Sequence, residues 1–243
     1  MPEIFAHTPV GSYSPSVGNR LLDTLDNEHL EDLLSHSTTV SLDLAQIVHE
    51  PNKFFKYVYF PTDGVVSTLC IMEDGQTAEV SAIGCEGFVG SALTLGVDRT
   101  PGRSMVQVKG SAIRMDADQF TDAIARDKGL NDLIERYIQT LIVRSSQTIA
   151  CNHLHPLRQR FAGFLLQISD CMHSDRFALT QEFMSQMLVV RRATVSTAAS
   201  EMQKAGLITY SRGKITVLDR AGLEAASCEC YQAVKQEYNR LLG

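Results

Sequence analysis

The residues best suited to chemistry lie in the stretch TQEFMSQMLVVRRATVSTAASEMQKAGLI, which begins at Thr180. Two adjacent arginines, Arg191 and Arg192, stand at the start of a segment whose apolar residues have helical spacing. A guanidinium group binds phosphates and guanine edges well, because both offer paired acceptors to its forked donors. The stretch therefore indicates contact with a nucleic acid.

The charge of the chain is unevenly distributed. The net charge is −6, yet residues 176–220 hold seven basic and three acidic residues, and residues 1–175 carry a net charge of −9. A basic block beside an acidic remainder is typical of a nucleic-acid-binding surface. No window approaches the roughly 18–20 apolar residues of a membrane span, and the N-terminus lacks the pattern of a secretion signal. We expect a cytoplasmic protein without a membrane partner.

Caps and breakers predict the elements that position the arginines. Pro156 restricts His155 to extended geometry and suits a helix start, which makes residues 152–156 a hinge. Thr180 is a candidate N-cap and Gly206 a candidate C-cap. The predicted elements are three helices and a basic-tipped hairpin, over 157–170, 181–188, 192–205 and 206–218.

The first half has a different texture. Leucines at helical spacing predict a helix from residue 21, with Asp26 as an N-cap for the segment that follows it. From about Thr38 to Met115, short β-branched runs alternate with turn residues, and Asp63-Gly64 and Asp74-Gly75 are hairpin signals. Such runs predict an antiparallel barrel or jelly roll.

A long helix is predicted over residues 117–152, with apolar residues on more than one face. The spacing of Leu130, Ile134, Tyr137 and Leu141 fits a coiled-coil seam, so we expect a homodimer; the alternative is a helix buried wholly within one chain. The predicted fold class is α+β. The predicted domains are a flexible tail, a sensor jelly roll, a dimerisation helix and a winged helix-turn-helix domain with a C-terminal helix, over 1–20, 21–116, 117–152 and 153–243.

From about residue 21 to residue 220 the chain resembles the Crp/Fnr family of bacterial transcription regulators. LTQEFMSQMLVVRRATVSTAASEMQKAGLITYSRGKITVLDR looks like that family's winged helix-turn-helix. VYFPTDGVVS, EDGQTAEVSAIGCEGFVG and RSMVQVKGSA look like its cyclic-nucleotide-binding-type jelly roll. The resemblance implies a homodimer on double-stranded DNA, with RNA polymerase as a further partner.

The resemblance also implies roles for single residues. Arg192 aligns with the base-reading arginine, and Arg191 stands where a capping serine is common, so we expect it at a phosphate. Ala193 replaces a glutamate that accepts from cytosine and could touch a thymine methyl group. Val189 replaces the glycine of the turn. The other expected DNA contacts are Thr180, Gln181, Ser196, Thr197, Arg212 and Lys214.

The effector pocket matches the family less well. Gly90 is present, but Ser91 replaces the glutamate that binds a ribose hydroxyl group in members that take cyclic AMP. Arg103 and Ser104 could hold a cyclic phosphate, with Arg99 as a substitute, and Ser145 and Ser146 align with hydroxyl groups that meet the base across the dimer. We expect an unidentified effector and no firm cofactor; a response to cyclic AMP is the alternative.

Metal and redox sites are not predicted. The six cysteines form no C-x-x-C pair, none precedes Cys70, and the C-x-C of Cys228 and Cys230 offers too few ligands for a closed metal site. Haem would need an axial ligand, and the nominees are His7, His49, His153 and His155.

Two other function classes are open to test. The chain has no G-x-S-x-G, P-loop or H-E-x-x-H motif, so we expect no enzyme. A ligand-sensing scaffold without DNA binding predicts a neutral or acidic second domain, whereas residues 176–220 carry +4. The expected function is a sequence-specific DNA-binding transcription regulator on a palindromic site.

Overall fold

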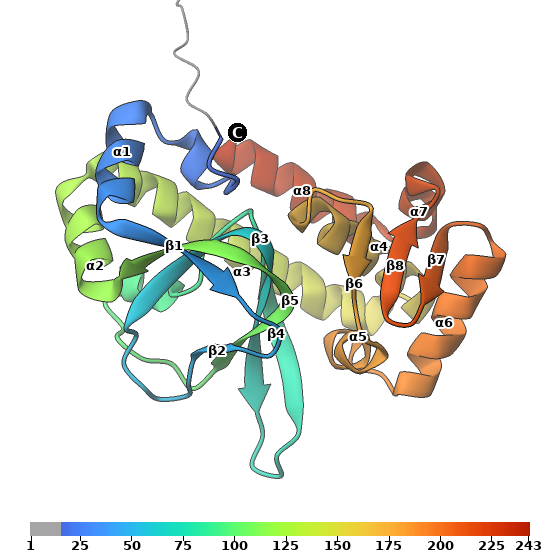
Figure 1. Cartoon of the computed structure of the whole chain (residues 1–243). Coiled ribbons are helices and arrows are strands. Elements are labelled where there is room, and N and C mark those ends of the chain that lie inside the picture. The colour runs from blue at the N-terminus through green and yellow to red at the C-terminus, as the bar shows by residue number, and fades with distance from the viewer. Residues whose placement is uncertain (1–15) are drawn as a thin grey trace, which may run out of the picture.

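The computed structural model describes residues 16–243 as an N-terminal β-rich half, a long helix and a helical C-terminal half (Figure 1). The predicted tail falls largely outside the described residues, and so does His7. Its last part is not a loose tail, because Asn19 is fully buried. The Asn19 side-chain amide donates to the carbonyl oxygens of Pro61, at 2.8 Å, and Gly87, at 2.9 Å.

Two short helical segments open the described chain, η1 (Leu22–Thr24) and α1 (Asn27–Ser35). Asp26 is the N-cap of α1, as predicted, and its carboxylate accepts from the backbone N–H of His29. Buried leucines, Leu22 and Leu33 among them, hold these segments against the sheet and the helices beside it.

The β-rich half is an antiparallel five-stranded sheet, which confirms the predicted class. Its strand order is β1-β5-β3-β4, with β2 paired to β5. The strands are β1 (Ser37–Leu42), β2 (Ile47–His49), β3 (Tyr57–Ile71), β4 (Thr77–Ile83) and β5 (Arg103–Asp116). The predicted turn at Asp74-Gly75 joins β3 to β4.

The second predicted hairpin, at Asp63-Gly64, is wrong. These residues lie inside β3, where the pairing with β5 shifts register on both sides of Asp63. Gly64 has a φ of 85°, and a Cβ atom there would lie 2.6 Å from the carbonyl oxygen of Val108. The glycine therefore permits an irregularity in one long strand, where the backbone of β3 approaches that of β5 closely.

The predicted helix over 117–152 is two helices, α2 (Ala117–Arg126) and α3 (Lys128–Leu154). Asp127 interrupts them with an extended backbone, and its side chain accepts from the N–H of Leu130, which starts a new helix. Before α2, a short segment η2 (Ser91–Leu95) lies near α2 and α3.

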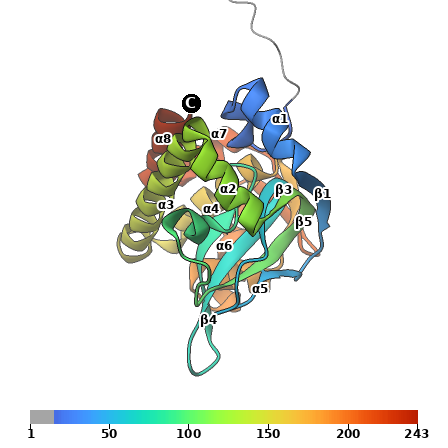
Figure 2. The same cartoon turned by 90° about the vertical axis from the view of Figure 1, so that its left-hand side faces the viewer.

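The predicted dimer seam is buried within the chain itself. Leu130, Ile134 and Tyr137 are at most 3% exposed, and Leu141 packs against the same core. The covering elements include α2 and a C-terminal helix, α8 (Glu229–Leu242), which lies along α3 (Figure 2). Since α8 belongs to this core through Tyr238 and Leu242, one apolar stripe of α3 is already occupied.

The C-terminal half follows the predicted hinge, where His155 is extended and Pro156 precedes a helix. Its elements are α4 (Leu157–Cys171), β6 (Arg176–Ala178), α5 (Gln181–Leu188), α6 (Arg192–Lys204), β7 (Ile208–Ser211), β8 (Lys214–Val217) and α7 (Arg220–Ala226). The three strands form a sheet in the order β6-β8-β7; β6 was not predicted.

The two halves share apolar core. Val65 and Ala82 of the β-rich half pack in the same cluster as Phe161, Leu165 and Met184 of the C-terminal half. Within residues 16–243, no helix is both long and apolar enough to cross a lipid bilayer.

Candidate nucleic-acid interface

The helix-turn-helix is built from α5, a three-residue turn and α6. Thr180 caps α5, as predicted, because its hydroxyl oxygen accepts from the N–H of Phe183 at 3.1 Å. Val189 ends α5 with a φ of 52°, a left-handed conformation that is unfavourable for a β-branched residue. Leu188 and Val195 are buried on the inner sides of the two helices. This packing fixes which side of α6 faces outward.

The predicted DNA contacts lie on that outward side of α6, at the start of α5 and on the wing beside them. Figure 1 shows α6 and the β7–β8 hairpin at the end of the molecule remote from α1 and α2. Gln181 is half-buried, and the other eight residues are exposed: Thr180, Arg191, Arg192, Ala193, Ser196, Thr197, Arg212 and Lys214. Four of these side chains, those of Arg191, Arg192, Arg212 and Lys214, are positively charged and attract anions.

A hydrogen-bond chain holds Arg192 in place. Its Nε donates to Oε1 of Gln181 at 3.1 Å, and Nε2 of Gln181 donates to the Ser196 hydroxyl oxygen at 3.3 Å. Among the described residues, neither Nη group of Arg192 has a hydrogen-bond partner. Two parallel donors are therefore available to a pair of acceptors such as O6 and N7 of guanine. This role of Gln181 was not predicted.

Within the described part of the chain, the other predicted contact residues around Arg192 and on the wing are not held by a comparable hydrogen-bond chain. Arg191 is the N-cap of α6, and no side-chain hydrogen bond caps the helix there. The hydroxyl of Thr197 donates to the carbonyl oxygen of Ala193 at 3.2 Å, within the helix. Ala193 presents only a methyl group. Arg212 and Lys214 flank Gly213 at the tip of the wing.

The predicted effector residues lie on several different elements. Gly90 lies beside Val58 near the start of β3, and Arg103 pairs with Leu69 near the end of the same strand. Arg103 is neutralised by Glu50, whose Oε2 accepts from Nε and Nη2, each at 3.1 Å. A cyclic phosphate would have to compete with this carboxylate for the guanidinium group.

The remaining pocket residues have local partners or face solvent. A Cβ on Gly90 would lie 2.9 Å from the Val58 side chain, and the residue has a φ of 111°, so the backbone itself requires glycine. Ser91 begins η2, and Ser104 is buried with its hydroxyl 3.5 Å from that of Thr68. Ser145 and Ser146 are exposed on α3.

A buried polar cluster that the sequence did not indicate lies between the sheet, α3 and α4. Arg144 donates to Oε1 of Glu86 at 3.1 Å, and the Cys171 thiol donates to Oε2 of the same carboxylate at 3.1 Å. Burial raises the pKa of Glu79 to about 8, opposed by Ser67 and the positive charge of Arg144. Oε2 of Glu79 has no hydrogen-bond partner among the described residues.

The nominated histidines within the described chain have different surroundings. His49 is buried and stacks on Phe55, with ring centroids 3.8 Å apart, and His153 is exposed on α3. His155 instead lies beside three cysteines, Cys151, Cys228 and Cys230, which are the residues that could hold a metal ion. Cys228 and Cys230 alone offer two ligands, and the fold adds two from the end of α3. The usable signal was the spacing of Cys151 and His155, one helical turn apart.

Comparison with known proteins bears on both halves. Residues 159–226 match the sequence model of the Crp-like helix-turn-helix domain. FixK2 from Bradyrhizobium japonicum superposes with a TM-score of 0.66, at 14% identity over 79% of this chain and 98% of that chain. The c-di-GMP-responsive regulator CLP of Xanthomonas campestris gives a TM-score of 0.63, at 13% identity over 79% and 99%.

A third solved structure is a putative cyclic nucleotide binding protein from Ruegeria pomeroyi. Its TM-score is 0.62, at 22% identity over 84% of this chain and 92% of that chain. At such identities the similarity shows the fold. No curated protein sequence matches the chain. The resemblance to Crp/Fnr regulators is thus confirmed by the Crp-like domain and by the fold of the whole.

Proposed function

We propose that this chain, with its Crp-like helix-turn-helix domain over 159–226, is a homodimeric DNA-binding transcription regulator that reads a palindromic site. The observation that supports this most is the exposed start of α6, where Arg192 is held by Gln181 with its Nη groups unpaired. A regulator of this kind works where the chromosome is, in the bacterial cytoplasm.

In this proposal α6 lies in the major groove, with its first residues against base edges. Arg192 donates to a guanine, and the methyl group of Ala193 meets a thymine methyl group, which changes the half-site relative to members with a glutamate there. Arg191, the N-terminus of α5 and the wing residues Arg212 and Lys214 contact phosphates, which fixes register without reading sequence.

Dimerisation in this proposal uses the free side of α3. Ile142 and Ile149 are 56% and 63% exposed, seven residues apart on the same helix. A spacing of seven residues equals the heptad repeat of a coiled coil, so the same helix of a second copy can cover both side chains. Two-fold symmetry then sets the half-sites about one helical turn apart, roughly 34–36 Å.

The effector remains unidentified in this proposal. The Arg103–Glu50 ion pair and the serine at position 91 argue against cyclic AMP at the predicted pocket. A contact with RNA polymerase is expected of an activator in this family and rests on the resemblance alone.

Salt dependence of binding to duplex DNA tests the proposal. Anisotropy titrations should show log affinity falling linearly with log salt, because bound phosphates release counterions. The double variant Arg212→Ala/Lys214→Ala should lower the slope by about 2, at roughly 0.9 per lost contact. A protein that binds no duplex at low salt is a scaffold, and the proposal fails.

A matched control removes the same charge elsewhere. Lys53 and Lys56 are both exposed in the segment between β2 and β3 of the β-rich half. The variant Lys53→Ala/Lys56→Ala should leave the slope unchanged. An equal loss of slope in both double variants would show that binding follows net charge and not the wing.

A further inference from the structure

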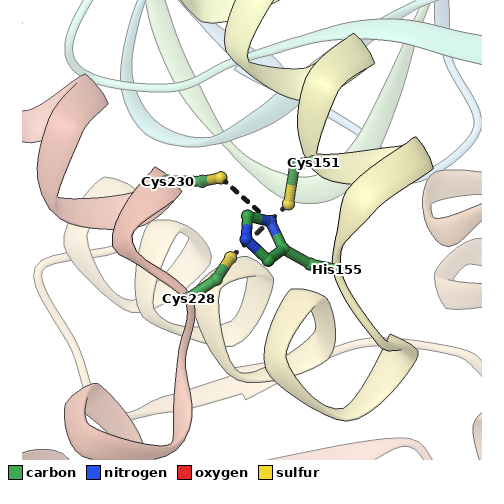
Figure 3. Close-up of side chains that lie close together, drawn as sticks. All are labelled: Cys151, His155, Cys228 and Cys230. Atoms are coloured by element: carbon green, nitrogen blue, oxygen red, sulfur yellow. Dashed lines mark hydrogen bonds between the residues drawn. The ribbon is translucent and has the colours of Figure 1, made fainter.

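Four potential metal ligands from distant parts of the sequence meet beside the hinge (Figure 3). Cys151 lies in the last turn and a half of α3, and His155 ends that helix. Cys228 is the N-cap of α8, and Cys230 lies in its first turn. Their ligand atoms all lie within 4.8 Å of one another. Figure 3 shows the three sulfur atoms around the imidazole ring.

The separations match a tetrahedral metal cage. The sulfur atoms of Cys151 and Cys228 are 3.5 Å apart, and Nδ1 of His155 is 3.4 Å from the sulfur of Cys230. With Zn–S bonds of about 2.3 Å and Zn–N bonds of about 2.0 Å, a tetrahedron has S–S and S–N edges of about 3.8 Å and 3.5 Å. Only small shifts are needed to admit an ion.

The surroundings orient the ligands as metal sites require. Nε2 of His155 lies 3.3 Å from Oε1 of Glu229, so the other ring nitrogen, Nδ1, is left to face the sulfurs. Nε2 of Gln147 donates to the Cys230 sulfur at 3.1 Å, a contact that stabilises a thiolate. Cys228 and Cys230 are buried, and the His155 side chain is only 18% exposed.

We propose that Cys151, His155, Cys228 and Cys230 bind one Zn²⁺ ion. Three thiolates and an imidazole form a closed tetrahedral set, which suits zinc and excludes calcium and magnesium, since both prefer oxygen. Binding releases three thiol protons to solvent, so the occupied site carries a net charge of −1.

The ion would tie the start of α8 to the end of α3. Since α8 follows the helix-turn-helix domain and α3 precedes it, the site clamps both ends of that domain at one point. Four protein ligands leave no open coordination position, so the ion is structural and does not activate water.

Metal analysis of the full-length protein, purified without chelators, tests the proposal. We expect one zinc per chain, and after exchange with Co²⁺ the absorption bands of tetrahedral cobalt with thiolate ligands. Cys228→Ser and Cys151→Ser should each weaken zinc affinity, measured against a chromogenic chelator, by at least about tenfold. Cys70→Ser is the control, because Cys70 lies in β3 outside the cluster, and should bind as the wild type does.

If a serine variant fails to fold, the cobalt spectra of the wild type still show whether thiolates bind the metal. Less than a tenth of an equivalent of bound metal after zinc is supplied would overturn the proposal. A Cys151–Cys228 disulfide in place of metal, iron with acid-labile sulfide, or equal loss of zinc in Cys70→Ser would overturn it too. None of these measurements involves DNA, so the site can stand if the proposed function fails.

A regulatory role of the zinc site, in which the bound ion changes the affinity for DNA, rests on the proposed function. Zinc-loaded and zinc-free protein should then differ in affinity for duplex DNA by at least about fivefold, the lower end of typical coupling between sites. Equal affinity, with zinc binding intact, would overturn the regulatory role and leave the site itself in place.

Discussion

Arg192 and Arg191 are adjacent in sequence and differ in how they are held. Arg192 is fixed by Gln181, from the preceding helix, through one of its three nitrogens. Arg191 caps the helix without a side-chain bond to it. A side chain held before binding loses less conformational entropy when it meets its partner. In the proposed complex we therefore assign base reading to Arg192 and the less demanding contact with a phosphate to Arg191.

Glu79 is a second single residue with a measurable effect, because its carboxyl group makes the stability of the fold depend on pH. Burial raises the pKa of its carboxyl group to about 8 in the folded chain, from an ordinary value of 4.5. Between these values the unfolded chain releases a proton that the folded chain keeps, so the free energy of unfolding falls as pH rises. Below pH 4.5 Glu79 is protonated in both states, so the cost of burying a charged carboxylate is absent. Above pH 8 it is ionised in both states, and this cost is constant.

Glu79→Gln should therefore stabilise the protein more at pH 8.5 than at pH 5.5. The amide keeps the shape of the protonated acid and cannot ionise, so the gain in urea midpoint should be larger at the higher pH by at least about 0.5 M. Glu73→Gln, at an exposed position before β4, is the control and should show no such difference. The same gain at both values would exclude a buried, titrating Glu79.

At the scale of elements, the sequence predicted best where a cap or breaker marks a boundary. Thr180 starts α5 as expected, Gly206 has the left-handed φ of 74° that ends α6, and Pro156 precedes α4. Asp63-Gly64 misled because a hairpin and an irregularity within a strand use the same residues. Asp127 was missed because one capping residue interrupts an otherwise continuous helical pattern.

Contacts between distant elements were the part that the sequence did not predict. The spacing of apolar residues along α3 predicted two apolar faces but not which of them packs against another helix of the same chain. In the structure, α8 covers the face that carries Leu130 and Tyr137. For the same reason Cys228 and Cys230 looked like an incomplete metal site. Cys151 and His155 join them only because α8 starts beside the end of α3.

The exposed stripe of α3 carries a prediction about assembly. Ile149→Glu should weaken self-association at least about tenfold, because it would bury an unpaired carboxylate in an apolar seam. Sedimentation of the variant should show monomers at concentrations where the wild type is dimeric. Leu44→Glu, which also adds a charge at an exposed apolar position, should leave the dimer intact. A dimer undisturbed by the change at residue 149 would place the interface elsewhere.

At the scale of the whole molecule, the path of the chain joins the halves twice. Residue 155 leads into the helix-turn-helix domain, and α8 returns from it to lie along α3 and to enter the N-terminal core with Tyr238. The basic segment 176–220 lies between these two connections, and the acidic remainder surrounds it in sequence. If residues 152–156 act as a hinge, we expect the domain between these two connections to move as a unit, which would reorient all of α6.

Selection of bound sequences from a pool of random DNA duplexes tests whether α6 and its copy in a dimer read a symmetric DNA site. The wild type should enrich two inverted half-sites whose centres lie about 10 base pairs apart. Arg192→Ala should still bind DNA in low salt but lose the preference for one guanine in each half-site, worth about 1–3 kcal/mol. Bound pools without a symmetric motif, or an identical motif from Arg192→Ala, would contradict the proposed function.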